Sequence, residues 1–352
     1  MTGLSGPFTW GAAPYAGHRT GLVTAVCAVA VLIVGVAGLV AGSSDLTLAD
    51  ALRTLVGAGS PPQQLIVLEL RLPRVAAGLT VGAALGLAGA LTQTFARNPL
   101  ATPDILGVTS GAGLGAVAAI VLAGGSYSLT SAVLGLGLPV AATLGASVTA
   151  LVVYGLAWRD GVDSYRLVLI GIGATAAIGG LTSFLIARAQ ITEAAAASQW
   201  LVGSLSGVSW PSVRPVLLAL VVVAPVALAQ GPDLDAGMLG DDVAAGLGAA
   251  IQRHRLLVLG CAVALTAAAV SASGPIGFVA FVAPQIAQGL AHRARPPLLA
   301  SALVGSVVVT GGDAFARSVL PGEIPVGIIT VAVGAPYLIW LLLHNTERKD
   351  MA

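Results

Sequence analysis

The chain has 352 residues, of which 57% are hydrophobic and only 9% are charged. Such a composition excludes a water-soluble domain of this length, because too little polar surface would remain to face water. The formal net charge of +1 gives no basis for a nucleic-acid or polybasic lipid partner. Most of the chain is therefore expected to lie in lipid.

Uncharged runs of about the length of a membrane-spanning helix recur along the sequence, since about 20 apolar residues cross the hydrocarbon layer. The runs are 21–42, 75–96, 105–124, 131–157, 167–187, 215–230, 256–274, 275–291, 298–316 and 324–343. Their unbroken hydrophobicity favours helices over the alternating pattern of an outer-membrane barrel. The predicted fold class is all-α, a polytopic membrane protein of about ten transmembrane helices. The first run is too long for a cleaved signal peptide and is predicted to be retained.

Basic residues indicate the orientation, because they prefer the cytoplasmic side of short loops. With a cytoplasmic N-terminus, ten arginine or lysine residues fall inside and six outside, so both termini are predicted to be cytoplasmic. A single domain over 1–352 would then have cytoplasmic tails at 1–20 and 344–352. Its longest inner loop, at 231–255, would join the sixth and seventh spans.

Several kinds of chemistry are disfavoured by what the sequence lacks. Lys349 is the only lysine, so the chain has no P-loop for ATP. Its acidic residues fall at span ends or in loops, whereas ion-coupled carriers usually need them near mid-membrane. The four histidines lack metal-ligand spacing, and no nucleophile, base and orienting acid occur together. We therefore predict no catalytic residue and no metal site, and we expect Cys27 and Cys261, in apolar runs, to be buried thiols.

Glycines repeat at four-residue steps in two of the predicted spans. The two sets are Gly78, Gly82, Gly86 and Gly107, Gly111, Gly115. Small residues on one helix face allow backbones to approach closely. We interpret both sets as helix-packing surfaces and not as a nucleotide-binding loop.

Short motifs carry a more specific signal than hydropathy. The sequence reads ELRLPR at 69–74 before the second span, RNPLATP at 97–103 after it, and LGVTSGA at 106–112. Proline stops the helix at 97–103, because it lacks an amide hydrogen and disfavours helix in the preceding residue. Later come LGDDVAAGLG at 239–248, GPIGFV at 274–279 with Pro284, and EIPVG at 323–327 with GAP at 334–336. In this order, over about residues 65–343, the motifs resemble the FecCD-type iron-siderophore and cobalamin permease family of ATP-binding-cassette importers.

The resemblance implies ten helices per subunit and a location in the cytoplasmic membrane. It also implies a second permease subunit, identical or paralogous, around a central path. Two cytoplasmic ATPase subunits and an extracytoplasmic substrate-binding protein would complete the importer. No cofactor is expected in this chain, since ATP and magnesium would be bound by the ATPase.

Arginines at the outer ends of spans are the candidates for docking the binding protein. In the resembling family, arginines matching Arg71, Arg74 and Arg317 receive acidic residues of the loaded binding protein. Two alternatives remain: Arg317 pairs within its helix with Asp313, four residues earlier, or Arg71 and Arg74 anchor their helix to lipid phosphate.

The inner loop is the candidate for contact with the ATPase. It is amphipathic, with Leu239, Val243 and Leu247 at four-residue steps and Asp241 and Asp242 on another side. The family places its coupling helices here, which implies coupling roles for Leu239, Gly240, Asp241, Asp242, Leu247 and Gly248. The alternative is an interfacial helix on lipid, which the acidic residues disfavour.

Two smaller inferences follow from the resemblance. The shorter inner loop at 159–166 aligns with the family's cytoplasmic gate and makes Ser164 and Tyr165 gate candidates, although turn formation or interfacial anchoring explains them as well. In the eighth span, Gln285 and Gln288 stand where the family usually has histidine and arginine, so no charge acts at these positions.

The leading hypothesis is a non-catalytic permease subunit that carries a ferric siderophore. Cobalamin or haem import by the same machinery is the alternative within transport. An ion-coupled secondary carrier and a membrane enzyme are alternatives from other classes. The cargo cannot be read from the sequence, because a path lined by small and aliphatic side chains leaves specificity to the binding protein.

Overall fold

The structure, a computed structural model, describes residues 14–42, 46–122, 137–159, 164–246, 250–320 and 323–349. Helices make up nearly all of these ranges, and no β-strand occurs in them. The predicted all-α fold class is confirmed.

Each of the predicted apolar runs falls on one helix of the described ranges. These are α1 (Pro14–Val40), α4 (Leu72–Ala96), α5 (Val108–Leu122), α7 (Gly137–Ala157), α8 (Ser164–Arg188), α10 (Trp210–Ala229), α13 (Ile251–Ser273), α14 (Val279–Ala291), α15 (Leu298–Val319) and α16 (Val326–Lys349). Seven spans in the described part are long and apolar enough to cross a membrane, while α5, α14 and the apolar part of α16 are shorter. The exact number of crossings therefore stays a prediction.

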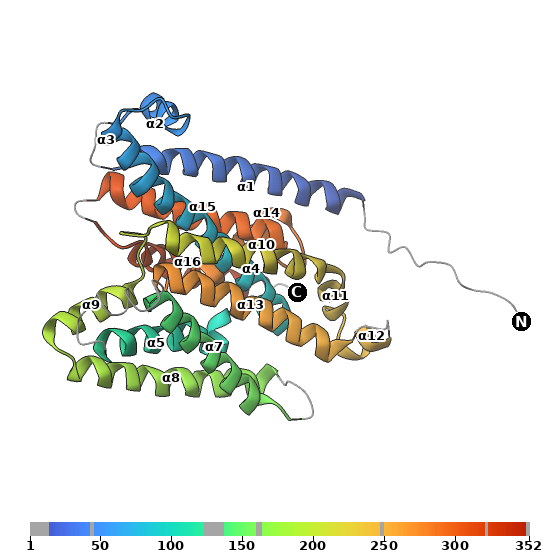
Figure 1. The fold of residues 1–352 in the computed structure, drawn as a ribbon. Helices are drawn as coiled ribbons and strands as arrows, with labels where there is room; N and C mark the ends of the chain where they lie inside the picture. The colour runs from blue at the N-terminus through green and yellow to red at the C-terminus, as the bar shows by residue number, and fades with distance from the viewer. Residues whose placement is uncertain are drawn as a thin grey trace, which may run out of the picture.

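Short helices occupy the two ends of the bundle. They are α2 (Leu48–Leu55), α3 (Pro61–Gln64), the π-helix η1 (Leu65–Arg71), the 3₁₀ turn η2 (Pro103–Leu106), α9 (Ile191–Val202), α11 (Gly231–Gly237) and α12 (Asp241–Gly246). Figure 1 shows α2, α3 and α9 at one end, here called the outer end, and α11 and α12 at the opposite, inner end. The names follow the predicted orientation.

Helix boundaries differ from the apolar runs where charges or breakers intervene. Helix α13 begins at Ile251, inside the predicted inner loop, because arginines end an apolar run without ending a helix. For the same reason α1 and α16 extend into the predicted tails. Helix α14 begins at Val279 and not at the predicted residue 275, since Phe278, the residue before it, has a φ of +64° and so does not continue a helix.

Helix α4 lies at the centre of the bundle and packs against α15 along a seam of small residues. A side chain at Gly82 would strike the backbone of Gly305, and one at Gly86 would strike the backbone of Ser301. The two backbones thus touch, as the glycine repeat of α4 predicted.

A second seam joins α5 to α7. Gly111 and Gly115 of α5 face Gly145 and its neighbours in α7, again with backbone against backbone. Gly107, which we grouped with them, instead ends η2 with a φ of +66° and precedes α5. Its role is therefore the turn, which an L-side chain would strain.

Candidate functional site

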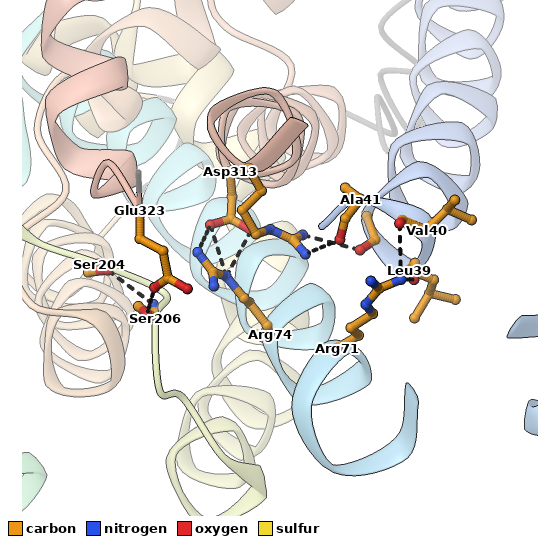
Figure 2. Close-up of polar contacts among 11 residues, drawn as sticks. Leu39, Val40, Ala41, Arg71, Arg74, Ser204, Ser206, Asp313 and Glu323 are labelled. Carbon is orange, nitrogen blue, oxygen red and sulfur yellow. Dashed lines mark hydrogen bonds and ion pairs between the residues drawn. The ribbon is translucent and has the colours of Figure 1, made fainter. Parts of the chain in front are cut away.

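Four charged side chains meet at the outer end of the bundle, where α1, α4 and α15 come together. We call Arg71, Arg74, Asp313 and Arg317 the outer charge cluster (Figure 2). All three arginines are the predicted docking residues. The structure brings Arg74 and Arg317 together on the carboxylate of Asp313, and Arg71 binds the same end of α1 as Arg317 does.

Asp313 is the acidic centre of this cluster, and its side chain is only 3% exposed. Arg74 binds it with Nε at 3.1 Å from both carboxylate oxygens and with Nη2 at 2.9 Å from one of them. Arg317, one turn later in α15, donates from Nε at 3.0 Å. A buried carboxylate that accepts from two guanidinium groups holds both in fixed orientations.

Arg71 binds the end of α1. Its Nη1 donates to the carbonyl oxygens of Leu39 at 2.8 Å and Val40 at 3.0 Å. The last carbonyls of a helix lack amide partners within it and carry partial negative charge. The guanidinium of Arg71 therefore caps α1 from a different helix.

Arg317 completes this cap. Its Nη2 donates to the carbonyl oxygen of Gly38 at 3.1 Å, and its Nη1 donates to that of Ala41 at 2.7 Å. With Nε on Asp313, every nitrogen of this guanidinium is hydrogen-bonded within the chain. The predicted pairing of Arg317 with Asp313 is confirmed, but it is one contact of three.

The alternative of lipid anchoring for Arg71 and Arg74 stays a prediction, although the structure gives both side chains contacts within the protein. Arg71 is 7% exposed and the Arg74 side chain is 13% exposed, and both bind protein groups. The structure does not test docking itself, which stays a prediction for Arg71, Arg74 and Arg317.

The wide turn before α4 has a specific cause in Pro73. In the π-helix η1, Leu72 donates to the carbonyl of Val67, five residues back. In the same pattern the carbonyl oxygen of Leu68 would accept a hydrogen bond from the amide of residue 73, but residue 73 is proline and has no amide hydrogen. The indole Nε1 of Trp210 in α10 donates to that carbonyl at 3.2 Å.

The predicted coupling segment folds as two short helices at the inner end. Leu239 and Gly240 lie between α11 and α12, and Leu239 is exposed, as is Val243. Gly240 has a φ of +106°, which favours glycine. Asp241 and Asp242 are the first residues of α12. Leu247 and Gly248 lie outside the described residues, so the coupling assignment stays a prediction.

One arginine links this segment to the loop between α14 and α15. Arg295 donates from Nε and Nη2 to the carboxylate of Asp235 in α11, with Nη2 at 3.0 Å. The same Nη2 lies 3.2 Å from the carbonyl oxygen of Gly231. Sequence reasoning missed this link, because the two residues are 60 positions apart and Arg295 counted only as an inner basic residue.

A polar cavity of about 130 Å³ lies beside that link. It is lined by amide side chains and two arginines, among them Gln93, Arg97, Gln285, Gln288 and Arg295. Gln285 donates to Gln93 at 2.7 Å, and Gln288 donates to the carbonyl oxygen of Ala294 at 2.9 Å. The glutamines that depart from the family pattern therefore bind other protein groups at the inner end.

Gate candidates Ser164 and Tyr165 form the start of α8, and Tyr165 is exposed. Residues 160–163, from the same predicted loop, lie outside the described ranges. The gate assignment stays a prediction. Over the described residues, no three His, Cys, Asp or Glu side chains gather so that they could hold a metal ion.

Comparison with known proteins decides the family. The model of the FecCD transport family matches residues 29–344. The chain belongs to this family. It is 36% identical over 339 residues to the ferric enterobactin transport system permease protein of Escherichia coli, covering 95% of this chain and 99% of that protein.

Two further relatives show the range of the family. Identity to the cobalamin import system permease protein of Halobacterium salinarum is 40% over 289 residues, or 81% of this chain and 75% of that one. A solved metal-chelate type ABC transporter in an inward-facing conformation matches with a TM-score of 0.80 and 27% identity, over 92% of this chain and 99% of the other. The protein is thus a multi-pass permease of the cytoplasmic membrane.

Proposed function

We propose that this chain is the membrane-spanning subunit of an ATP-driven importer and that its cargo is a ferric siderophore. The observation that carries the proposal is the match to the FecCD transport family over nearly the whole chain. The Escherichia coli relative that covers 95% of this chain is named for ferric enterobactin. A hydrophilic iron chelate needs a path through a protein to cross the membrane, because its polar groups are not soluble in the lipid core.

The chain itself catalyses no reaction under this proposal, and a partner ATPase dimer supplies the free energy. The exposed apolar side chains Leu239 and Val243 at the inner end support such a partner. ATP and magnesium would be bound by that ATPase. Leu247 and Gly248 would extend the same contact, and Ser164 and Tyr165 would narrow the inner exit of the path.

At the outer end, charge supports an acidic partner. The outer charge cluster holds three arginines and one aspartate, which leaves two positive charges. Acidic side chains of an extracytoplasmic binding protein would be steered to this surface, at a rate that falls with salt.

A second permease subunit would cover apolar surface that this chain leaves open. Only 11% of the most apolar stretch of helix α8 is buried within the chain, and Leu169, Ile172 and Phe184 on this helix are exposed. A homodimer or a paralogous heterodimer would enclose the path between two such subunits.

Reconstitution tests the proposal. Proteoliposomes containing the chain, its ATPase and its binding protein should accumulate a radiolabelled ferric siderophore only when ATP is inside. Ionophores should leave this uptake unchanged. Uptake that continues without ATP and stops with ionophores would refute the proposal in favour of a secondary carrier.

Cobalamin or haem is the second candidate cargo, and the Halobacterium salinarum relative, named for cobalamin import, is the observation that favours cobalamin. Competition separates the cargoes in the same vesicles. An excess of unlabelled cobalamin or haem should leave ferric siderophore uptake unchanged if the siderophore is the cargo. If cobalamin or haem is the cargo instead, that compound should accumulate when it carries the label and the ferric siderophore should not.

A further inference from the structure

Helix α2, at the outer end, presents an apolar face away from the rest of the chain. Its side chains are Leu48, Leu52 and Leu55 of α2 and Val56 directly after it, here called the α2 strip, and all four are exposed. We propose that the α2 strip inserts among the acyl chains of the outer lipid leaflet and that Arg53 beside it binds lipid phosphate groups. The inference goes beyond the proposed function, because it depends neither on the cargo nor on the ATPase.

The sequence of α2 separates an apolar face from a buried one. The members of the α2 strip stand at positions i, i+4, i+7 and i+8, which share one face of a helix. On another face, Ala51 and Thr54 are both 0% exposed. A short helix that buries one side against protein and leaves leucines on another is suited to lie in the interface between lipid and water.

Contacts at both ends of α2 fix the direction of the α2 strip. A side chain at Gly59, in the turn to α3, would strike the hydroxyl group of Thr54, so this turn packs closely on the buried face. At the start of the helix, the Oγ1 of Thr47 accepts from the amide of Asp50 at 3.2 Å. Turning the α2 strip toward the bundle would break the packing of Thr54, so the strip stays on the outside.

The position of α2 places this strip next to a surface that already faces lipid. Helix α2 packs against α1, α3 and η1, and Figure 1 shows it beside the outer end of α1, on the opposite side of the bundle from α8. Helix α1 is long and apolar enough to cross the membrane, and only 17% of its most apolar stretch is buried within the chain. Leu32, Ile33 and Val36, toward its outer end, are exposed. The α2 strip therefore continues the lipid-facing surface of α1.

The charge of Arg53 favours phospholipid as the occupant. Arg53 is exposed and stands three residues before Val56, which places it at the edge of the α2 strip. A long arginine side chain beside an apolar face can extend to the headgroups while the leucines stay among the acyl chains. The acid of this helix, Asp50, accepts from the amide of Thr47 at 3.2 Å and so belongs to the helix cap.

The two protein partners of the proposed importer suit this face less well. A second permease subunit would cover α8, which lies on the opposite side of the bundle (Figure 1). A binding protein steered by acidic side chains finds its positive charge in the outer charge cluster, whereas the α2 strip offers it only leucine and valine. An apolar strip that no partner covers is stable next to lipid and costly in water.

Spin-label accessibility of the full chain in phosphatidylcholine nanodiscs tests the depth of the α2 strip. Cys27→Ala and Cys261→Ala remove the free cysteines of the described residues. A nitroxide at Leu52→Cys should then have a ratio of oxygen access to nickel-chelate access at least about threefold higher than one at Ser60→Cys, because oxygen concentrates in lipid. Ser60 is an exposed polar residue of the turn before α3, and Leu32→Cys on α1 gives the value for a side chain in lipid.

Anionic lipid tests the part played by Arg53. Replacing part of the phosphatidylcholine with phosphatidylglycerol should lower the nickel-chelate access at Leu52→Cys by about twofold, because the arginine draws α2 toward the charged headgroups. Adding Arg53→Gln should abolish this effect of the lipid. Glu69→Gln is the matched control, since Glu69 is an exposed residue of η1 at the same end, and it should keep the effect.

Four results would overturn the proposal. Equal nickel-chelate access at Leu52→Cys and Ser60→Cys would show that the α2 strip faces water. Exclusion of both reagents from Leu52→Cys would show that a second copy of the chain covers it. Oxygen access that is lost only when the binding protein is added would assign the strip to that partner. An equal effect of phosphatidylglycerol with and without Arg53 would refute the binding of phosphate.

Discussion

Replacing Asp313 with asparagine should destabilise the outer end of the bundle by removing one buried charge. The carboxylate is 3% exposed and accepts from Arg74 and Arg317, whose side chains are 13% and 9% exposed. An amide in its place leaves two guanidinium groups facing each other without a counter-charge. Removing one partner of a buried ion pair costs about 3–5 kcal/mol. Because both arginines keep some solvent access, and Arg317 keeps its two carbonyl acceptors, we expect about 3 kcal/mol.

The thermal unfolding midpoint in nanodiscs measures this effect, and a fall of about 5 °C is expected for a chain of this size. Glu69→Gln is the control, since Glu69 is an exposed acid of η1 at the same end and should shift the midpoint far less. Adding Arg74→Gln to Asp313→Asn should recover part of the loss, because one uncompensated cation disappears. If Asp313→Asn unfolds at the wild-type temperature, the carboxylate does not hold the cluster and the reasoning fails.

Three further predictions concern other parts of the fold. Gly82→Ala should unfold the chain or lower its yield sharply, because the added carbon strikes the backbone of α15. Gly155→Ala in α7 is the control and should be neutral, because its added carbon meets no atom within 4 Å. The yield of folded protein from size-exclusion chromatography compares the two variants. Gly240 has a φ of +106°, so Gly240→Ala should strain the backbone between α11 and α12 by about 1 kcal/mol and reduce the amount of cargo taken up per ATP hydrolysed. The same uptake per ATP in the variant and the wild type would contradict this. Hydrogen bonds from Thr47 lower the pKa of Asp50, so the cap of α2 should be intact above about pH 4 and lost as the pH falls further. Amide hydrogen exchange at residues 48–55 measures this, and a protection that acid leaves unchanged would count against it.

The helices and their packing were largely predictable from the sequence, because lipid imposes a simple rule on composition. Each apolar run became a helix, and the glycines of α4 and α5 pointed to contacts that the structure contains. The boundaries were less predictable. Helix α13 begins before Arg253, since a charged residue can continue a helix into water.

The outer charge cluster was predictable in its members but not in its arrangement. The motif at 69–74 identified Arg71 and Arg74, and helical spacing predicted the pair of Asp313 with Arg317. The salt bridge from Arg74 to Asp313 spans 239 positions, and no local pattern reports such a distance. The binding of Arg71 to the end of α1 was equally hidden, because backbone carbonyls have no signature in a sequence.

The packing also limits how this chain can move during transport. Gly82 of α4 touches the backbone of Gly305 in α15, and backbones in contact cannot slide without a clash. Helix α15 carries Asp313 near its outer end, and the loop before its inner end carries Arg295, so α15 connects the outer charge cluster to the link with α11. Movement during transport is then expected between this pair and the other helices of the bundle. Distances between spin labels on α4 and α15 should accordingly stay constant through the ATP cycle, and a change there would show that the pair is not rigid.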